Sequence, residues 1–337
     1  MPHKTSFDRA QVSVIIVNWN TGTYLKRCIL SLSKQIMPPC EVIIVDNAST
    51  DSSAVGLEEC YPHVKVVRLD KNIGFAAANN HAVRLVSEEC EWLALLNPDA
   101  FPEPTWLESL MDAVKHHPEY AFFGSRLMNA NEPSNYDGTG DIYHISGLVW
   151  REGHGNAADA STLKMKEIFS PCAAAALYRR SAMLEVNGFD EDYFCYVEDV
   201  DLGFRLRLLG YRCLYVPDAV AYHVGSASTG GQRGDFAVYH GHRNLVWTYV
   251  KNMPGALFWL LLPLHIALNL VTTIRFSLQG QGAVILKAKW DALCGIPRMW
   301  KKRRQVQDSR CASLGEILKA LDKSFLPRLS QFRPRWL

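Results

Sequence analysis

The first half of the chain contains four short apolar runs, and a polar turn follows each of them. The runs lie at 12–17, 41–45, 64–68 and 92–96. They are rich in Val, Ile and Leu, and the run at 12–17 is a continuous apolar, β-branched segment of the kind buried on both faces of a parallel sheet. Segments with helical spacing separate the runs, so the pattern predicts right-handed βαβ units.

Further elements follow from the same reading. Helices are predicted at 24–33, 75–86, after Pro104 and at 202–209, and strands at 173–178 and 212–216. A proline is favoured in the first turn of a helix and a glycine just after its end, as with Gly210. Residues 129–166 are rich in Gly, Asn, Asp and Ser, which predicts loops and short strands.

Polar side chains mark the carboxyl ends of the predicted strands: Asn18, Asp46, Asn72 and Asp99. Ligands of open parallel sheets bind beyond these ends, so we expect the four positions to converge on one rim. Taken alone, Asp46 is better explained as a turn or helix-cap residue, and its context at the strand end favours the binding role. No glycine-rich GxGxxG loop follows the first strand, which argues against a nicotinamide-dependent dehydrogenase.

Charge divides the chain near residue 250. Residues 1–250 hold 21 basic and 30 acidic residues, whereas residues 251–337 hold 15 basic and 4 acidic residues. We therefore predict a domain at 1–250 and a helical, apolar and basic region at 251–337. Nucleic-acid binding is not expected, because no recognised module accompanies the basic tail.

The stretch 252–274 has no charged residue and is long enough to span a bilayer. A single span would place the basic tail opposite the body, against the preference of Lys and Arg for the cytoplasmic side. An interfacial or re-entrant helix followed by the basic run 301–304 on anionic lipid satisfies both facts. A helix buried against the main domain is the alternative.

Compartment is indicated by the cysteines and by the start of the chain. Nine cysteines form no CxxC pair and lie mostly in apolar runs, which suits a reducing compartment and gives no support to a zinc site. Residues 1–11 lack the apolar stretch of a signal peptide. We therefore expect the body to lie in the cytosol, peripherally on the cytoplasmic face of the membrane.

Several segments together resemble family 2 glycosyltransferases, especially their rhamnosyltransferase branch. They are VSVIIVNWNTGTYL (12–25), EVIIVDNASTD (41–51), KNIGFAAANN (71–80), LLNPDA (95–100), FDEDYFCYVEDVDLGFRLRLLGYR (189–212), AYHVGSAS (221–228) and HRNLVW (242–247). Each segment alone is unspecific, whereas their order and spacing are distinctive. The resemblance implies a GT-A type α/β fold, with a mostly parallel sheet flanked by helices, over residues 12–250.

That resemblance also implies where a nucleotide-sugar donor binds. The implied donor-binding residues are Val17, Asn18, Asn20, Asp46, Asn72, Gly74, Asn97 and Asp99. Gly74 would let backbone approach the nucleotide closely, although a simple helix-entry turn explains it equally well. Residues 170–174 lie where the family keeps small side chains beside the donor sugar.

A divalent metal is implied at two positions. Asn97-Pro98-Asp99 occupies the place of the family's DxD motif but keeps one carboxylate, and His223 stands where the family has a histidine ligand. Mg²⁺ tolerates one or two protein carboxylates and fills its remaining positions with phosphate and water. We therefore expect Mg²⁺ or Mn²⁺ to bind at Asp99 and His223. An imidazole ligand favours Mn²⁺ over Mg²⁺, so Mn²⁺ is expected to be the better activator.

The acidic segment Glu198-Asp199-Val200-Asp201 is predicted to be catalytic. Transfer requires removal of a proton from an acceptor hydroxyl as it attacks the sugar, and a carboxylate serves as general base. The resemblance assigns that role to Asp199, with Glu198 and Asp201 orienting the acceptor or stiffening the loop. Acids that decorate a helix N-terminus are the structural alternative. Tyr193, Phe194 and Tyr196 are either acceptor-stacking rings or ordinary core.

Taken together, the sequence predicts an inverting, metal-dependent glycosyltransferase of cell-surface polysaccharide synthesis. The resemblance implies L-rhamnose from dTDP-L-rhamnose as the donor sugar and a saccharide or lipid-linked acceptor. A hexosyl- or galactofuranosyltransferase is the alternative within the family. A catalytically inactive nucleotide-binding scaffold subunit is the alternative outside it, although such a subunit would not need Asp99, Asp199 and His223.

Overall fold

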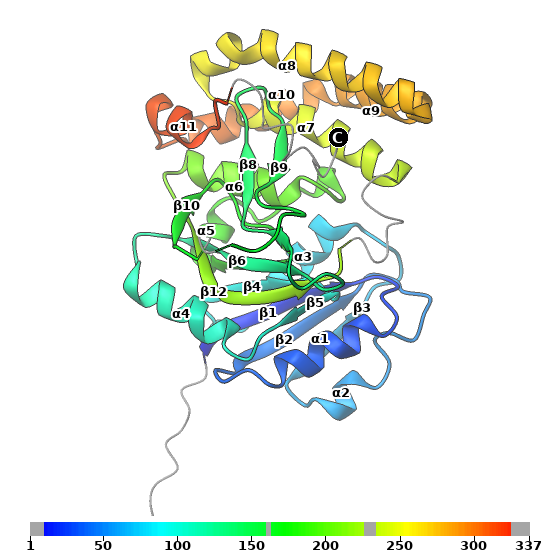
Figure 1. Cartoon of the computed structure of the whole chain (residues 1–337), viewed down its shortest axis with the longest axis vertical. Helices are drawn as coiled ribbons and strands as arrows, with labels where there is room; N and C mark the ends of the chain where they lie inside the picture. The colour runs from blue at the N-terminus through cyan, green and yellow to red at the C-terminus, as the bar shows by residue number, and fades with distance from the viewer. Residues whose placement is uncertain (1–9, 160–162, 226–233, 325–337) are drawn as a thin grey trace, which may run out of the picture.

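The computed structural model describes residues 10–159, 163–225 and 234–324 (Figure 1). Residues 1–9, which belong to the start of the chain predicted to lack a signal peptide, lie outside the described residues, as do residues 226–228 of the segment 221–228. The helices are α1 Tyr24–Leu32, α2 Leu57–Cys60, α3 Phe75–Val83, α4 Trp106–His116, α5 Arg180–Glu185, α6 Glu198–Leu208, α7 Asp235–Asn252, α8 Gly255–Phe276, α9 Gly282–Cys294, α10 Ile296–Asp308 and α11 Leu314–Ala320. A short 3-10 turn, η2, covers Glu191–Tyr193, and a π turn, η3, covers Ser277–Gln281.

The strands form one large mixed sheet and one small ribbon. They are β1 Ala10–Asn18, β2 Pro39–Asp46, β3 Val64–Arg68, β4 Trp92–Leu96, β5 Ala100–Pro102, β6 Phe122–Asn129, β7 Tyr136–Gly138, β8 Asp141–Tyr143, β9 Val149–Arg151, β10 Lys166–Ile168, β11 Ala175–Arg179 and β12 Cys213–His223. The order in the large sheet is β10-β12-β6-β11-β4-β1-β2-β3, with β5 on β12 and β7 on β6. Strands β8 and β9 pair only with each other among the named strands.

The first four strands are parallel, as the βαβ pattern predicts. Strand β11 differs, because it lies antiparallel between β4 and β6. The described residues between β6 and β11 contain no α-helix, and a parallel pair needs such a crossover connection. The excursion through β7 to β10 therefore reverses the chain direction before β11 enters the sheet.

Alternate residues of each central strand face opposite layers of helices. Val12, Val14 and Ile16 of β1 pack with α1, α2 and α4. Ile15 and Val17 of the same strand pack with α3, α5 and α6. Because successive side chains of a strand point to opposite faces, a continuous apolar run is required for burial on both sides.

A third layer, α7 to α11, covers the outer side of α6 (Figure 1). Every residue of α6 is buried, since one side packs on the sheet and the other contacts the C-terminal helices. The helix begins at Glu198, four residues before the predicted start at 202. The acidic residues therefore lie within its first turn, where the helix dipole favours negative charge.

Helices α8 and α9 form the outermost part of the C-terminal region (Figure 1). The chain leaves helical geometry at Gly280, whose φ is 87°. Beyond the turn, Lys289 of α9 lies next to Asn269 of α8, and its Nζ donates to the Asn269 Oδ1 at 2.6 Å. The two helices thus run back along each other as a hairpin, with α9 between α8 and α7.

Candidate active site

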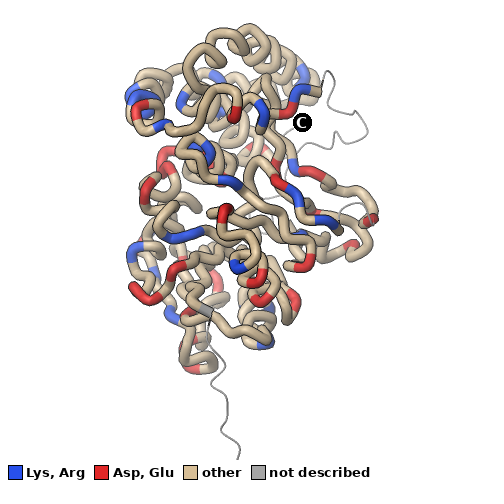
Figure 2. Tube along the Cα trace, turned by 90° about the vertical axis from the view of Figure 1, so that its left-hand side faces the viewer, with Lys and Arg blue, Asp and Glu red and all other residues tan. Residues whose placement is uncertain are grey.

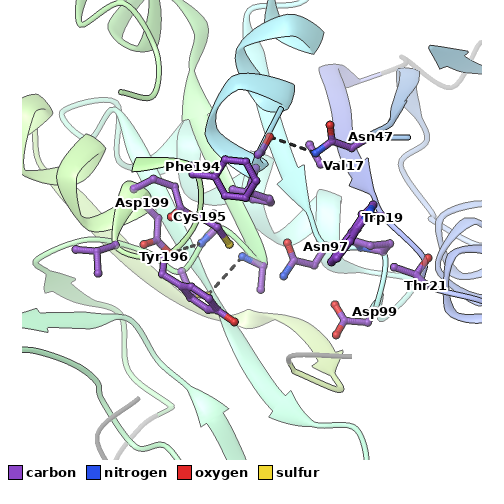
Figure 3. Close-up of a pocket in the computed structure, with 18 of the residues that line it drawn as sticks. Val17, Trp19, Thr21, Asn47, Asn97, Asp99, Phe194, Cys195, Tyr196 and Asp199 are labelled. Atoms are coloured by element: carbon purple, nitrogen blue, oxygen red, sulfur yellow. Dashed lines mark hydrogen bonds between the residues drawn. The ribbon is translucent and has the colours of Figure 1, made fainter. Parts of the chain in front are cut away.

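A cavity of about 400 Å³ lies beyond the carboxyl ends of β1 and β4 (Figure 3). Eight of the twelve residues predicted for the site line it: Val17, Asn72, Gly74, Asn97, Asp99, Glu198, Asp199 and His223. Asn18, Asn20, Asp46 and Asp201 were also predicted and are not among the lining residues. The rim expected from the strand ends is therefore present, and some of its polar residues form the layer behind it.

Asn18 and Asp46 shape the loops behind the cavity. The Asn18 side chain is fully buried, and its Nδ2 donates to Asp46 Oδ1 at 3.0 Å and to Ser53 Oγ at 2.8 Å. Asn20 Oδ1 accepts a hydrogen bond from the backbone N–H of Thr50 at 2.7 Å. These bonds tie the turn after β1 to the turn after β2, so both turns present a fixed surface to the cavity.

Asn47 is a cavity residue that the sequence reasoning did not single out. Its Nδ2 donates to Asn72 Oδ1 at 2.8 Å, and its Oδ1 accepts from the backbone N–H of Ile73 at 2.9 Å. It therefore fixes the turn that carries Asn72 and Gly74. Trp19 was missed as well, although a large aromatic residue in a polar turn at a strand end is an unusual feature that could have drawn attention to it.

Position 74 requires a glycine, both because of its backbone conformation and because another residue lies close to it. Its φ of 87° lies in the region that favours glycine. A Cβ atom at this position would lie 2.6 Å from the ring of Phe194. The glycine thus serves as the entry to α3 and as the point where the acidic segment approaches the β3–α3 turn.

Asp99 and His223 meet at the cavity wall. His223 Nε2 lies 3.3 Å from Asp99 Oδ1 and 3.3 Å from Asn97 Nδ2. Asp99 follows β4, whereas His223 ends β12, and pairing of β5 with β12 brings the two segments together. Both side chains are buried apart from the face that borders the cavity.

Asp137, which the sequence reasoning missed, lies behind this pair. Its Oδ2 accepts from His223 Nδ1 at 2.8 Å and from Arg151 Nη1 at 2.7 Å. Burial opposes the charge of His223, but Asp99 and Asp137 raise its pKa to about 9. Burial likewise opposes the charge of Asp137, yet His223 and Arg151 hold its pKa well below the usual range.

This arrangement fits a metal-binding histidine. A ligating histidine usually gives its second ring nitrogen to a carboxylate, which fixes the tautomer and directs the free nitrogen to the metal. Asp137 stands in that position, and Nε2 of His223 faces Asp99 at the cavity. Within residues 10–159, 163–225 and 234–324, no group of three or more His, Cys, Asp or Glu side chains is arranged as a metal site. With only one or two protein ligands, Mg²⁺ would take its remaining ligands from substrate phosphate and water.

Asp199 lines the opposite wall of the cavity from the first turn of α6 (Figure 3). Its Oδ2 accepts from the backbone N–H of Ala173 at 3.2 Å, and its Oδ1 accepts from that of Val200 at 2.9 Å. The neighbouring Glu198 also lines the cavity. Cys172, Ala173 and Ala174, from the predicted small-residue segment 170–174, line the cavity beside Asp199 and Asn97.

Asp201 points the other way, into a buried ionic cluster. Its Oδ1 lies 2.8 Å from Lys251 Nζ and accepts from Asn252 Nδ2 at 2.7 Å and from the Tyr193 hydroxyl at 3.0 Å. Arg205 Nε donates to its other oxygen at 2.9 Å. Burial opposes its charge, but Lys251 and Arg205 lower its pKa. The contacts of Asp201 with α7 therefore explain its presence in the acidic segment without a role in the cavity.

The aromatic residues of the acidic segment divide in the same way. Phe194 and Tyr196 line the cavity together with Phe236 of α7. His240 stacks on Phe194 with ring centroids 5.4 Å apart, and burial lowers the pKa of its ring to about 4. Tyr193 instead packs in the core against Trp247. An aromatic wall thus faces the space between Asp199 and the start of α7.

Residues 13–186 match the model of the family described as "Glycosyl transferase family 2". The chain is 31% identical over 237 residues to the N-acetylglucosaminyl-diphospho-decaprenol L-rhamnosyltransferase of Mycobacterium tuberculosis, and this match covers 64% of the chain and 77% of that protein. It is 28% identical over 225 residues to Rhamnosyltransferase WbbL of Escherichia coli, covering 63% of the chain and 83% of that protein.

The fold is also similar to a solved mannosyltransferase from Pyrobaculum calidifontis, whose structure contains GDP-Man and Mn²⁺. The TM-score is 0.54 and the sequence identity 17%, and the match covers 93% of this chain and 87% of the other. A likeness at this identity concerns the fold, including the position of the sheet and its flanking helices.

Proposed function

The chain belongs to glycosyltransferase family 2, in its rhamnosyltransferase-like branch, and from this premise we propose that it transfers L-rhamnose from dTDP-L-rhamnose with inversion. The acceptor we propose is a saccharide or lipid-linked saccharide of cell-surface polysaccharide synthesis. The observation that carries the proposal is the joint lining of one cavity by Asp99, His223 and Asp199. The relatives' names support the choice of sugar.

In the proposed reaction, Asp199 takes the proton from the acceptor hydroxyl while its oxygen attacks C1 of the donor sugar. The bond from C1 to the diphosphate breaks in the same step, so the configuration inverts and no covalent enzyme intermediate forms. Asp99 and His223 would hold Mg²⁺ or Mn²⁺, which neutralises charge on the leaving diphosphate. The turns that carry Val17, Asn72 and Gly74 would bind the nucleotide.

A panel of nucleotide sugars tests this proposal. Purified protein is offered dTDP-, UDP- and GDP-sugars with Mn²⁺, Mg²⁺ or a chelator, and release of nucleoside diphosphate is measured with and without a lipid-linked acceptor. Chelator-sensitive turnover of dTDP-L-rhamnose supports the proposal. Turnover of a hexosyl or galactofuranosyl donor alone would replace the sugar, and nucleotide binding without turnover in every combination would favour a scaffold subunit.

Replacing Asp137 by Asn is expected to raise the Mn²⁺ concentration needed for half-maximal turnover by about 10- to 100-fold. Asn keeps the shape but removes the charge that supports the His223 ring. Electron paramagnetic resonance of Mn²⁺ in the presence of nucleoside diphosphate measures binding separately from turnover. Asp141→Asn is the matched control, because Asp141 contacts Arg151 at 3.5 Å and is equally buried. Equal Mn²⁺ requirements in the two variants would contradict the prediction.

We also propose that residues 251–337 bind the cytoplasmic face of a membrane. Gly255–Cys294 is long and apolar enough to span a bilayer by length and composition, and only 22% of its most apolar window is buried. Figure 2 shows the outer helix at the top as an almost uninterrupted uncharged coil. Its exposed apolar residues include Trp259, Leu260, Leu270, Val271, Ile274 and Leu278, followed by Leu286, Trp290 and Leu293 of α9.

Contacts of α8 with the body favour an orientation along the membrane surface. His265, near the middle of α8, is buried, bonds to the backbone oxygen of Ser146 at 2.8 Å and stacks on Tyr249 at 4.0 Å. A helix that is anchored at its middle and exposes one apolar side suits the interface rather than a span. Lys301 and Arg304 of α10 are exposed and available to anionic headgroups.

The basic run 301–304 is only partly available to lipid, which corrects the expectation from sequence. Lys302 Nζ lies 2.6 Å from Asp192 Oδ2 and also pairs with Asp190. Arg303 is buried and donates to the backbone oxygens of Val250 and Met253. Arg303 therefore faces the end of α7, whereas Lys302 faces the acidic residues at the η2 turn.

Introducing charge on the apolar face is expected to release the protein from membranes. The triple variant Leu260→Glu, Leu270→Glu and Ile274→Glu should reduce the fraction pelleted with phosphatidylglycerol vesicles at least about tenfold, because it removes apolar contact and adds repulsion. The control carries the same three charges on the exposed residues Leu30, Ile36 and Leu184 of the catalytic domain. Equal pelleting of both variants would refute membrane binding through α8.

A further inference from the structure

The segment that leads into α6 has an unfavourable backbone conformation. Phe194, Tyr196 and Val197 have φ values of 64°, 70° and 68°. Bulky and β-branched residues rarely adopt positive φ, and each such residue costs about 1–3 kcal/mol unless its surroundings enforce the conformation. We call residues 193–197 the pre-catalytic loop, because it directly precedes Glu198 and Asp199.

Asn244 of α7 is the side chain that contacts most of this loop. It is fully buried, and its Nδ2 lies 3.0 Å from the backbone oxygens of both Tyr193 and Cys195 and 2.7 Å from that of Tyr196. An amide nitrogen has two hydrogens, so they are shared among the three oxygens. This single group thus gathers carbonyls that no regular secondary structure would satisfy.

Arg243 fixes the orientation of that amide. Its Nε donates to Asn244 Oδ1 at 3.0 Å, and its Nη2 donates to the backbone oxygen of Tyr193 at 3.0 Å. With its oxygen engaged by Arg243, the Asn244 amide must present its NH₂ group to the loop. The two neighbouring residues of the HRNLVW segment therefore hold the loop together.

The opposite side of the pre-catalytic loop meets the β3–α3 turn. The Phe194 ring fills the space where Gly74 lacks a Cβ atom, and the backbone oxygen of Phe194 accepts from the N–H of Ala76 at 3.2 Å. Phe194, Cys195 and Tyr196 also line the cavity. The loop therefore contacts the turn proposed for nucleotide binding and precedes the proposed base.

We propose that Asn244 is a positioning residue, which sets the place of Asp199 by holding the pre-catalytic loop in its left-handed conformation. Asn244 itself does not line the cavity, so it acts through the backbone of residues 193–197. The proposal rests on Asp199 being the base. Misplacement of a reacting group by about 1 Å costs about 10²-fold in rate, which defines the effect that loss of Asn244 should have.

The test compares Asn244→Asp with the parent protein. Asp has the same shape, but its second oxygen would face three carbonyl oxygens without hydrogens to share. We expect kcat to fall about 10²-fold, while the Kd for nucleoside diphosphate stays within about threefold. Hydrogen exchange of the amides of residues 194–199 should accelerate at least about tenfold.

His242→Ala is the control for general damage to α7. His242 is as buried as Asn244 but faces the C-terminal hairpin, where its ring lies 4.8 Å from that of Phe276. This variant should lower the thermal stability and leave both kcat and exchange at residues 194–199 near the parent values. An equal loss of kcat in the two variants, or unchanged exchange in Asn244→Asp, would overturn the proposal.

A second variant keeps the test decisive if Asn244→Asp does not fold. Arg243→Lys retains the charge but loses the fork that bonds Asn244 and Tyr193, so exchange at residues 192–196 should rise and kcat should fall about tenfold. Unchanged exchange here would overturn the role of the pair. Asp199→Asn is measured in parallel: if it retained full turnover, the assignment of the base would fail, whereas exchange would still decide whether Asn244 holds the loop.

Discussion

Replacing Asp199 by Asn is expected to lower the rate of sugar transfer by about 10²-fold or more while donor binding stays near normal. Asn matches Asp in shape and can still accept the hydrogen bond that the Ala173 N–H donates at 3.2 Å. It cannot take a proton from the acceptor hydroxyl, so the loss should appear in kcat. Single-turnover transfer and equilibrium binding of the donor measure the two effects separately.

The matched control for this variant is Asp218→Asn. Asp218 lies exposed in the middle of β12, so the same chemical change there should leave transfer unaltered. Full transfer by the Asp199 variant would remove the proposed base. A large rise in donor Kd with unchanged kcat would instead assign Asp199 to donor binding.

Replacing Asp99 by Ala is expected to reduce transfer by about 10²-fold or more, because the metal would lose its protein carboxylate and the leaving diphosphate its charge partner. His223 would remain, together with its bond to Asp137 at 2.8 Å. Transfer is measured across Mn²⁺ concentrations, and Mn²⁺ binding with nucleoside diphosphate is measured by paramagnetic resonance. We expect both to weaken together.

Asp112→Ala controls for loss of a carboxylate, since Asp112 is exposed on α4 and away from the cavity. It should leave the Mn²⁺ requirement unchanged. Full activity of the parent protein in chelator would contradict metal dependence altogether. Unchanged Mn²⁺ binding by the Asp99 variant would show that the carboxylate has another role.

The positions of the early strands could be predicted because their signal is local. The runs at 64–68 and 92–96 coincide with β3 and β4, and β1 and β2 extend the predicted runs by one to two residues at each end. Burial on both faces demands largely unbroken apolar sequence in the central strands, whereas β3 lies at the sheet edge and leaves Lys65 exposed. The turn residues that follow mark the strand ends. Asp99, Asn72 and Gly74 could be placed at the cavity for the same reason.

Residues that act through distant contacts had no local signal. Asp137 bonds His223 across 86 positions of sequence, and Asn244 reaches the pre-catalytic loop across about 50. Asp137 lies in the Gly- and Asn-rich excursion, where one carboxylate resembles any other turn residue. Its partner is fixed only when β6 pairs with both β7 and β12.

The acidic segment shows the same division within four residues. The sequence alone determined that Glu198, Asp199 and Asp201 lie close together next to the N-terminus of a helix, because proximity along the chain and charge near a helix N-terminus are local properties. Tertiary structure decided that Asp199 faces the cavity while Asp201 pairs with Lys251 at 2.8 Å. Asp199 and Asp201 are two residues apart, so their side chains leave α6 in directions that differ by about 200° around its axis. Only the packing of the sheet on one side and of α7 on the other determines which of these directions faces the site.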